Sequence, residues 1–461
     1  MRRLREPPEP QLLEDRCELQ PASHAPRAVI ILPRCVGFGV SDVVRRCGFI
    51  NRVTAVVLQP ASVFTSLVWR LVVPLVGGME GFERNGSGGK SLRKREDLTS
   101  FEPYSWEPST EEIARSVGIS PGRVVRMDTN VSPYAPVEVL KRLAGRLPRL
   151  RVNHYPDTSY RELRELLSDY ADWDQDLIVP TNGADEGIDV ISSAFLRSGL
   201  SAVAPVPTYS YFRVSTELQG ARFVPVERGQ DFGFSADDLL ERYDKSTAVF
   251  WICDPNNPTG NLTDEGALRR LCEETEALVV IDEAYFEFSG RTSLRLLRDY
   301  PNVCVVRTLS KAFGLAGLRI GYVLCTEEVV RELNKARPPN SLGTVNVAGA
   351  VIALRNRGYV ERVVKEIVRE RERMALELTR IDGLTVFPSS ANFLLVRLRS
   401  ESEASAVKDA LLRRGIVVRT FPGNPRLGDC IRVTVCSRRE NERFLRALRS
   451  ALEEVREGRR R

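Results

Sequence analysis

The sequence predicts an α/β protein with a mainly parallel central sheet, covered by helices on both faces, and a smaller α+β domain toward the C-terminus. From about residue 110, short apolar runs alternate with amphipathic segments. These runs are apolar throughout, as expected of strands that are buried on both faces of a parallel sheet. Near the C-terminus, further strand-like runs alternate with helical segments, which predicts the second domain.

The strands expected in the central sheet follow one another along the chain. They are "DLIVP", "SAVAP", "AVFWIC", "ALVVID" and "VCVVRT". After the first of them, Ile188, Ile191 and Phe195 recur at helical spacing and predict a helix. A long charged amphipathic helix is expected around 343–380, and "ANFLLVRL", "GIVVR" and "CIRVTV" are the strands expected after it.

Three parts of the chain are predicted. Residues 151–335 should form the large domain, and residues 110–150 together with 336–461 the small one. Residues 1–90 have no clear periodicity, and we expect a poorly ordered or dispensable extension there, with Met79 as a possible true start. Its longest apolar run, "VFTSLVWRLVVPLVGG", contains an arginine and a proline and is too short to span a bilayer.

Composition narrows the class of protein. The 461 residues carry a net charge of +6, and 43% are hydrophobic and 28% charged, which is typical of a soluble globular protein. Basic and acidic residues are interspersed, so neither a nucleic acid nor a membrane is predicted as a partner. The nine cysteines form no CxxC pair, which predicts a reduced, cytoplasmic compartment.

Histidine chemistry is largely excluded. The chain has two histidines, His24 and His154, too few for most zinc sites or serine-type triads, and no metal site is predicted. We interpret His154 as a structural residue.

Lys311 is the first candidate for chemistry. It lies in "RTLSKAFGLAGLRIGY", among small and apolar residues and without a neighbouring carboxylate. An isolated lysine of this kind usually extends its amine to solvent. However, Asp282 ends one predicted strand, the turn "DPNNPTGN" follows another, and "TNGADEG" opens a helix whose N–H groups suit a phosphate.

Together these pieces describe a phosphate-bearing aromatic cofactor at the strand ends, bound to the lysine through a Schiff base. Such a cofactor needs a desolvated lysine, a carboxylate facing its pyridinium nitrogen, and N–H and cationic groups at its phosphate. Each piece also has a plainer interpretation, since Asp282 could cap the next segment and Tyr209 and Tyr285 could be ordinary half-buried aromatics.

The segments "GADEGI", "PTYSYF", "DPNNPTG", "DEAYFEF" and "RTLSKAFGLAGLRIGY" occur in this order. Over residues 125–450 the chain therefore resembles the fold-type I aminotransferases that use pyridoxal 5′-phosphate (PLP), and most closely the histidinol-phosphate aminotransferase branch. The resemblance implies the three-layer PLP-transferase fold and a homodimer.

The resemblance also implies roles for individual residues. Lys311 would hold the cofactor and move the substrate proton. Tyr155, in "NHYPD", would reach the phosphate of the neighbouring subunit's cofactor. The other implied cofactor contacts are Asp282 at the pyridine nitrogen, Asn257 and Tyr285 at the phenolic oxygen, Tyr209 at the ring face, and Ala184, Asp185, Ser310 and Arg319 at the phosphate.

For the substrate, the resemblance implies a phosphorylated amino alcohol, L-histidinol phosphate, and a 2-oxo acid, 2-oxoglutarate. Arg419 and Arg432 match positions that meet the substrate's anionic groups, and Tyr134 matches an aromatic that closes over it. The chain departs from the branch where "DTNVSPYAP" replaces an "NENPYG"-like segment.

Three alternatives remain open at this point. They are a threonine-phosphate decarboxylase, an aromatic or broad-specificity amino-acid aminotransferase, and a catalytically inactive binding protein with the same fold.

Overall fold

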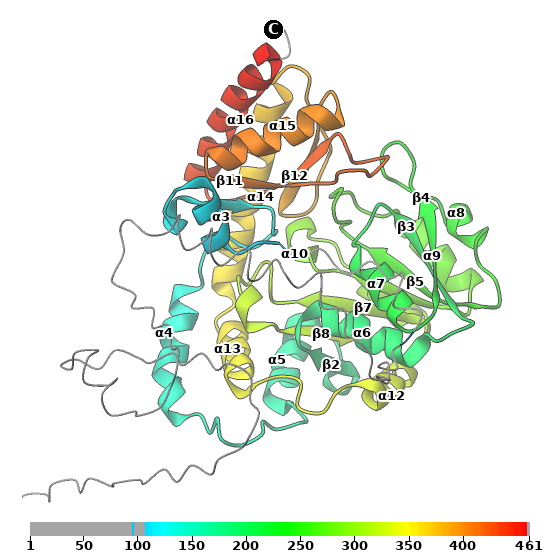
Figure 1. Ribbon diagram of the computed structural model, residues 1–461. Coiled ribbons are helices and arrows are strands. Elements are labelled where there is room, and N and C mark those ends of the chain that lie inside the picture. The colour runs from blue at the N-terminus through cyan, green and yellow to red at the C-terminus, as the bar shows by residue number, and fades with distance from the viewer. Residues whose placement is uncertain (1–94, 96–106, 459–461) are drawn as a thin grey trace, which may run out of the picture. The chain divides into compact units, whose positions relative to one another are not determined.

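A computed structural model describes Arg95 and residues 107–458 (Figure 1). The extension expected at residues 1–90, with Met79 as its possible start, lies outside the described residues.

A seven-stranded sheet forms the centre of the described part of the chain, in the order β2-β8-β7-β6-β5-β3-β4. Every neighbouring pair is parallel except those of β8, which runs antiparallel to both β2 and β7. The mainly parallel sheet predicted from the sequence is therefore confirmed. Its strands are β2 (Ile178–Thr181), β3 (Ser201–Val206), β4 (Arg222–Glu227), β5 (Thr247–Cys253), β6 (Leu278–Asp282), β7 (Val303–Thr308) and β8 (Gly321–Leu324).

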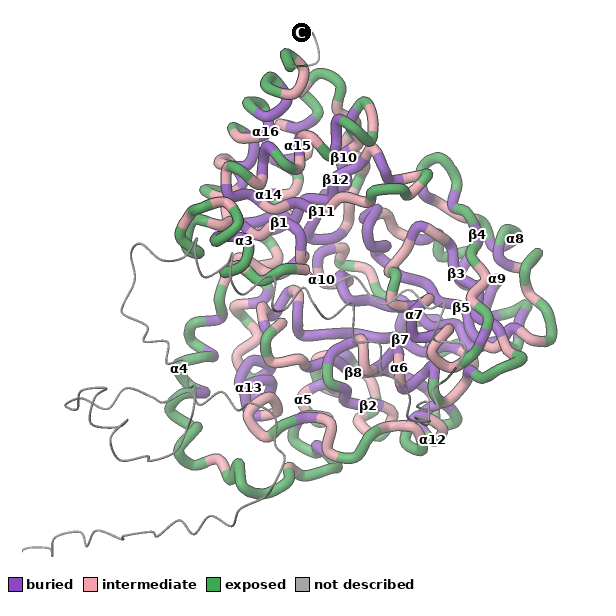
Figure 2. Tube along the Cα trace, in the orientation of Figure 1, coloured by how far each residue is buried: buried purple, intermediate pink, exposed green. Residues whose placement is uncertain are grey.

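Helices cover both faces of this sheet, which gives three layers (Figure 1). In β6, Leu278 and Val280 face the core that contains α6, α7 and α12, while Val279 and Ile281 face the core that contains α5, α9 and α11. Figure 2 shows the strands as the most continuously buried part of the large sheet region. The helices of these layers are α5 (Arg161–Ala171), α6 (Gly183–Phe195), α7 (Tyr211–Leu218), α8 (Ala236–Leu240), α9 (Glu265–Glu274), α10 (Phe286–Ser289), α11 (Leu294–Asp299) and α12 (Glu327–Ala336).

The reversed strand β8 has a geometric consequence. Two antiparallel steps in succession restore the strand direction, so β2 runs the same way as β7. The carboxyl ends of β2, β5, β6 and β7 therefore lie at one edge of the sheet, where open α/β sheets place their ligands.

A second sheet of five strands is built by the two ends of the described chain, in the order β1-β11-β12-β10-β9. β1 joins it through parallel pairing with β11, although about 290 residues separate their pairing partners Val125 and Ile416. Its elements are β1 (Val125–Met127), β9 (Thr385–Val386), β10 (Phe393–Arg397), β11 (Ile416–Thr420) and β12 (Cys430–Thr434), with α3 (Thr110–Val117), α15 (Glu401–Arg413) and α16 (Arg438–Gly458).

The helix expected around 343–380 is interrupted. The structure has α13 (Thr344–Arg355) and α14 (Gly358–Thr379) instead of one helix. Asn356 ends α13 outside the helical conformation, and its side-chain amide donates to the carbonyl of Ile352 at 2.6 Å. Asparagine competes with the helix backbone in this way, and the nearby glycine lowers helix propensity further.

α13 packs against α4 (Val137–Arg146) and α5, and one continuous hydrophobic core contains residues of both sheets. Short 3₁₀ turns connect several elements, namely η3 (Pro121–Arg123), η4 (Leu147–Arg149), η5 (Gln175–Leu177) and η6 (Ala316–Leu318). The boundaries 110–150, 151–335 and 336–461 for two domains stay a prediction. Among the residues described, no helix has the length and apolar composition needed to cross a membrane.

β8 approaches the turn between β2 and α6 very closely at Gly321. A Cβ atom at this position would collide with the carbonyl carbon of Gly183 and lie 2.6 Å from the amide nitrogen of Ala184. Because these contacts are with backbone atoms, we expect Gly321→Ala to lower the free energy of unfolding by about 1–3 kcal/mol, measured by urea denaturation.

The matched control is Gly145→Ala in α4, where a Cβ would meet no heavy atom within 4 Å. Alanine also has the higher helix propensity, so this variant should be at least as stable as the parent. Equal stability of the two variants would show that the approach at Gly321 does not constrain the fold.

Candidate active site

The edge formed by the carboxyl ends of β2, β5, β6 and β7 gathers most of the predicted site residues. Asp282 is the last residue of β6, Asn257 lies in the turn after β5, and Lys311 lies in the loop after β7. Ala184 and Asp185 are in the first turn of α6, which starts directly after β2. The structure therefore brings these predicted residues together at one edge of the sheet.

Lys311 is half-buried and has an unusual environment for an amine. Its Nζ donates to the carbonyl of Thr129 at 3.4 Å and lies 5.7 Å from the centre of the Tyr285 ring. Among the described residues it forms no ion pair of its own. Loss of hydration, reinforced by the charge of Arg432, lowers the pKa of Lys311 to about 8.

Asp282 is almost completely buried. One of its carboxylate oxygens accepts the backbone N–H of Ala284 at 3.0 Å, in the turn before α10. Burial nevertheless raises the pKa of Asp282 to about 7. A buried carboxyl with so few partners is suited to receive an N–H group from a ligand.

The start of α6 and the loop after β7 form a cradle for an anion. Arg319 adopts a left-handed backbone conformation with φ of 50°, which brings its guanidinium within 3.4 Å of the Ser310 hydroxyl and 2.9 Å of the Asp185 carboxylate. Gly183 has φ of 82°, a conformation that residues with a side chain rarely adopt, and a Cβ there would lie against the Arg319 guanidinium. Cationic, hydroxyl and helix N-terminal N–H groups together match a phosphate.

Tyr209 is held at the border of this cradle. Its hydroxyl donates to Asp185 at 2.8 Å, and its ring meets the edge of Phe212 with centroids 5.7 Å apart. Phe212 in turn is stacked on Trp251 at 5.1 Å in the core. Tyr209 is thus fixed at both ends, as a ring that flanks a planar ligand needs to be.

Arg432 connects the second sheet to this site. From β12 it donates to Asn257 Oδ1 at 2.5 Å and also to the carbonyl of Asp128. Arg419 lies directly opposite it on β11, but its guanidinium pairs with Glu107 at 3.0 Å. The structure therefore brings Arg432 to the predicted site residues, while Arg419 has a different partner.

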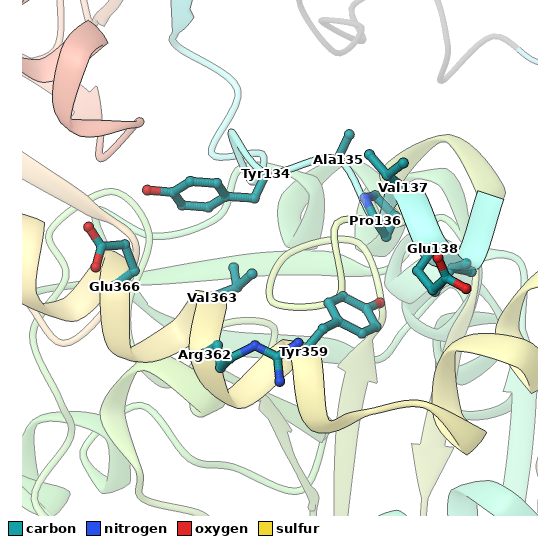
Figure 3. Close-up of a pocket in the computed structure, with 10 residues that line it drawn as sticks. Tyr134, Ala135, Pro136, Val137, Glu138, Tyr359, Arg362, Val363 and Glu366 are labelled. Atoms are coloured by element: carbon teal, nitrogen blue, oxygen red, sulfur yellow. The ribbon is translucent and has the colours of Figure 1, made fainter. Parts of the chain in front are cut away.

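The two remaining predicted tyrosines lie farther out. Tyr134 lines a pocket of about 280 Å³ between the segment before α4 and the first turns of α14, where Figure 3 shows it with Val363 and Glu366. Burial raises the pKa of Tyr134. Tyr155 lies in the loop before α5, is 86% exposed, and has no contact with the other predicted residues among those described.

Sequence reasoning missed Asn130, whose side-chain amide donates to the Tyr285 hydroxyl at 3.2 Å. Asn130 is almost fully buried and has φ of 53°. The available signal was an asparagine in the segment "DTNVSPYAP", directly after the short strand β1, because asparagine is one of the few residues that adopts this conformation easily.

Comparison with known proteins agrees with this geometry. Residues 123–448 match the family described as "Aminotransferase class I and II". A histidinol-phosphate aminotransferase from Ruminiclostridium cellulolyticum is 34% identical over 357 residues, which cover 76% of this chain and 96% of that protein.

The chain belongs to the class I and II aminotransferase family. The resemblance to histidinol-phosphate aminotransferases inferred from the motifs is confirmed, as is the expected fold. Among solved structures, a histidinol-phosphate aminotransferase from Sinorhizobium meliloti in complex with PLP has a TM-score of 0.72 and 26% identity, and the match covers 80% of this chain and all of that one.

A threonine-phosphate decarboxylase from Porphyromonas gingivalis has a similar fold, with a TM-score of 0.62 at 23% identity, over 72% of this chain and all of that one. At this identity the similarity concerns the fold alone. It does not favour decarboxylation over amino transfer in this aminotransferase.

PLP is the cofactor of this aminotransferase, and the residues at the sheet edge fit it. The fit rests on the donor set: a partly desolvated amine on Lys311, a buried carboxyl on Asp282, and the cradle at Gly183 and Arg319, which a Cβ would fill. These groups match the aldehyde, the pyridine nitrogen and the phosphate of PLP respectively.

The raised pKa of Asp282 predicts a pH-dependent stability of the aminotransferase freed of PLP. The folded pKa of about 7 exceeds the ordinary value of 3.8. Between these values the folded protein keeps a proton that the unfolded chain has lost, so stability falls as the pH rises through this window. Asp282→Asn removes this effect, so it should raise the melting temperature more at pH 8 than at pH 4.5.

The control is Asp409→Asn on α15, where the side chain is 53% exposed and pairs with Lys408. Its effect on the melting temperature should be small at both pH values. An Asp282→Asn effect of the same size at pH 4.5 and pH 8 would contradict the assigned burial of a charged carboxylate.

Proposed function

We propose that this aminotransferase exchanges an amino group between L-histidinol phosphate and 2-oxoglutarate, a step of histidine biosynthesis. The observation that carries the proposal is the similarity to a histidinol-phosphate aminotransferase over 96% of that protein's length. The geometry adds Arg432, a buried arginine within reach of the predicted cofactor residues. A phosphorylated substrate requires such a cation.

Lys311 is proposed as the group that moves the proton. PLP, when bound, supplies the electron sink that makes the Cα proton of the substrate removable. With a pKa of about 8, Lys311 Nζ exists partly as the neutral amine near neutral pH, so it can accept that proton and later return it. Ala312 and Phe313, which follow Lys311 in the chain, are buried.

The other residues are proposed to bind and orient the cofactor. Asp282 would accept the pyridine N–H, and Asn257 and Tyr285 would bind the phenolic oxygen. The raised pKa of Asp282 supports this arrangement, because a buried carboxylate gains most from a cationic N–H partner. The remaining proposed contacts are the N–H groups of Ala184 and Asp185, with Ser310 and Arg319, at the phosphate, and Tyr209 beside the ring.

For the substrate we propose Arg432, Arg419 and Tyr134. Directly opposed residues of an antiparallel pair lie on the same face of the sheet, so Arg419 and Arg432 share one face. To bind an anion on this face, Arg419 must break its ion pair with Glu107. The side chains of Arg419 and Glu107 are 30% and 28% exposed, so breaking this pair costs little free energy.

No specific observation favours the alternatives. An aromatic or broad-specificity aminotransferase needs one cation for a carboxylate but no second one, whereas two opposed arginines are present here. Partial desolvation destabilises the charged form of Lys311, as its lowered pKa indicates. A catalytically inactive binding protein would have no need of a lysine in this environment.

We further propose that the enzyme is a cytoplasmic homodimer in which Tyr155 reaches the partner's cofactor phosphate. Five of the six large hydrophobic side chains that are exposed in the described chain lie in residues 137–155. Exposed apolar side chains are typical of interaction surfaces where they gather in one patch. The six cysteines of the described chain are free and buried, which supports a reduced compartment.

The substrate is tested by the visible absorption of the purified enzyme with PLP. Histidinol phosphate should bleach the absorption of bound PLP, and 2-oxoglutarate should restore it, because amino transfer is reversible in two halves. Phosphothreonine serves as the comparison compound. Release of carbon dioxide from phosphothreonine without amino transfer would instead establish the decarboxylase.

The role of Tyr155 is tested with mixed dimers of Lys311→Ala and Tyr155→Ala subunits. If Tyr155 acts in the partner's site, a mixed dimer has one intact site, because the subunit that keeps Lys311 receives Tyr155 from its partner. Random pairing should then restore about a quarter of the parental activity, since half of the dimers are mixed.

Each variant alone should have little activity in this experiment. If Tyr155 acted within its own subunit, no site of the mixed dimer would be intact, and mixing would restore nothing.

A further inference from the structure

Asn130, in the segment after β1, touches a proposed cofactor residue through its side chain. It is 1% exposed, and all of its polar groups have partners. Its backbone N–H and side-chain oxygen both contact Thr434 Oγ1, at 3.0 and 3.1 Å. Its backbone carbonyl accepts from the Asn392 amide at 3.0 Å, and its own amide nitrogen contacts the Tyr285 hydroxyl at 3.2 Å.

The directions of these hydrogen bonds follow from what each group is able to donate. The backbone N–H of Asn130 can only donate, so Thr434 Oγ1 is the acceptor in that bond. The single hydroxyl proton of Thr434 is then available for Asn130 Oδ1. With Thr434 donating to Oδ1, the NH₂ end of the Asn130 amide faces Tyr285 and donates to its hydroxyl.

The orientation of the Asn130 amide determines the role of the Tyr285 hydroxyl in their hydrogen bond. An NH₂ group can only donate, so the Tyr285 oxygen accepts in its bond with Asn130. The one proton of that hydroxyl is therefore directed elsewhere. Within residues 107–458 the Tyr285 hydroxyl donates to no protein acceptor, which leaves the proton for a ligand.

Charged and titratable groups from several elements surround Tyr285. Arg432 on β12 lowers its pKa, while Cys253 on β5 and Asp282 on β6 raise it, as burial does most strongly. Lys311 Nζ lies over its ring, and Phe393 of β10 meets the ring edge-on at 5.2 Å. The Tyr285 ring is therefore packed on its edge and one face, and its hydroxyl hydrogen can still rotate about the C–O bond.

We propose that Asn130 is a positioning residue that makes the Tyr285 hydroxyl a hydrogen-bond donor toward the phenolic oxygen of PLP. The inference rests on the proposed contact of Tyr285 with that oxygen. By occupying the acceptor side of the hydroxyl, Asn130 keeps its proton on the ligand side, which stabilises the ionised phenolic oxygen. Thr434 contributes by fixing the orientation of the Asn130 amide.

The same contacts join the two sheets. Thr434 is in β12, two residues after Arg432, and Tyr285 follows β6 of the central sheet. The proposed substrate arginine and the donor direction of Tyr285 therefore depend on the position of one strand.

The test uses the holoenzyme and the pH midpoint of the visible absorption of bound PLP. Asn130→Asp preserves the size of the side chain but replaces the NH₂ donor by an acceptor, so Tyr285 should donate to the introduced carboxylate instead. The midpoint is expected to rise by about one to two pH units, the effect of losing a hydrogen bond to a charged group. If Asn130 had a purely structural role, only the through-space effect of the new charge would remain in this midpoint.

Tyr285→Phe provides the control background. The shift that Asn130→Asp still produces there measures the through-space effect of the new charge, and we expect it to be less than half of the shift in the parent. Equal shifts in the two backgrounds would overturn the inference.

The same series separates this inference from the proposed function. If Tyr285→Phe alone leaves the midpoint unchanged, Tyr285 does not contact the phenolic oxygen, and the site assignment fails together with the inference. If Tyr285→Phe raises the midpoint while Asn130→Asp does not, only the inference fails.

A second variant keeps the test decisive if Asn130→Asp does not fold. Thr434→Val retains a β-branched side chain in β12 but removes the hydroxyl that orients the Asn130 amide. The midpoint should again rise, by less than in Asn130→Asp. An unchanged midpoint in Thr434→Val, with folding verified by circular dichroism, would count against the proposed donor direction.

Discussion

The withdrawal of two ionisable groups from water at one sheet edge is the constraint on which the rest of the site depends. Lys311 and Asp282 both have pKa values displaced toward the neutral form, one downward to about 8 and the other upward to about 7. Each displacement is a cost that the fold accepts. A ligand that carries an aldehyde at one end of a ring and a basic nitrogen at the other offsets both costs at once, because it reacts with the amine and gives the carboxylate a cationic partner.

Such a site needs a rigid support, and a buried ion pair next to it provides one. Glu283 follows Asp282 and pairs at 2.8 Å with Arg307, which precedes Lys311 by four residues; their side chains are 1% and 2% exposed. Glu283 also accepts from Thr292 Oγ1 and from the backbone N–H of Ser293. Loss of one partner of such a pair costs about 3–5 kcal/mol. The pair therefore holds the ends of β6 and β7 in register, and with them the two reactive groups.

The sequence predicted those parts of the fold in which a local pattern of residues also determines their position in space. The strands with short apolar runs and the residues that end them were predicted correctly, because parallel strands place their carboxyl ends together whatever the connections between them. The edge strand β4 was missed because Pro225 and exposed polar residues interrupt its pattern. The reversal of β8 was also not predictable, since four residues of strand have the same pattern in either direction.

Side-chain partners were the least predictable feature. Arg419 and Arg432 have similar sequence surroundings, but one meets Glu107 and the other Asn257. Both partners are far away in sequence, so no spacing rule indicates them. The role of Asn130 was not predictable for the same reason. It depends on hydrogen bonds with Thr434 and Tyr285, which are far from Asn130 in the sequence and meet it only in the folded chain.

The antiparallel direction of β8 also determines how short the connection between β7 and β8 is. Because β8 returns antiparallel to β7, Lys311 and Arg319 belong to one short connection between neighbouring strands, residues 309–320. In the proposed site, these two residues would contact the aldehyde and the phosphate of one small molecule, so the length of this connection would have to suit the size of that molecule. A contiguous stretch of sixteen letters can therefore identify this chemistry, although the complete site is assembled from many distant parts of the chain.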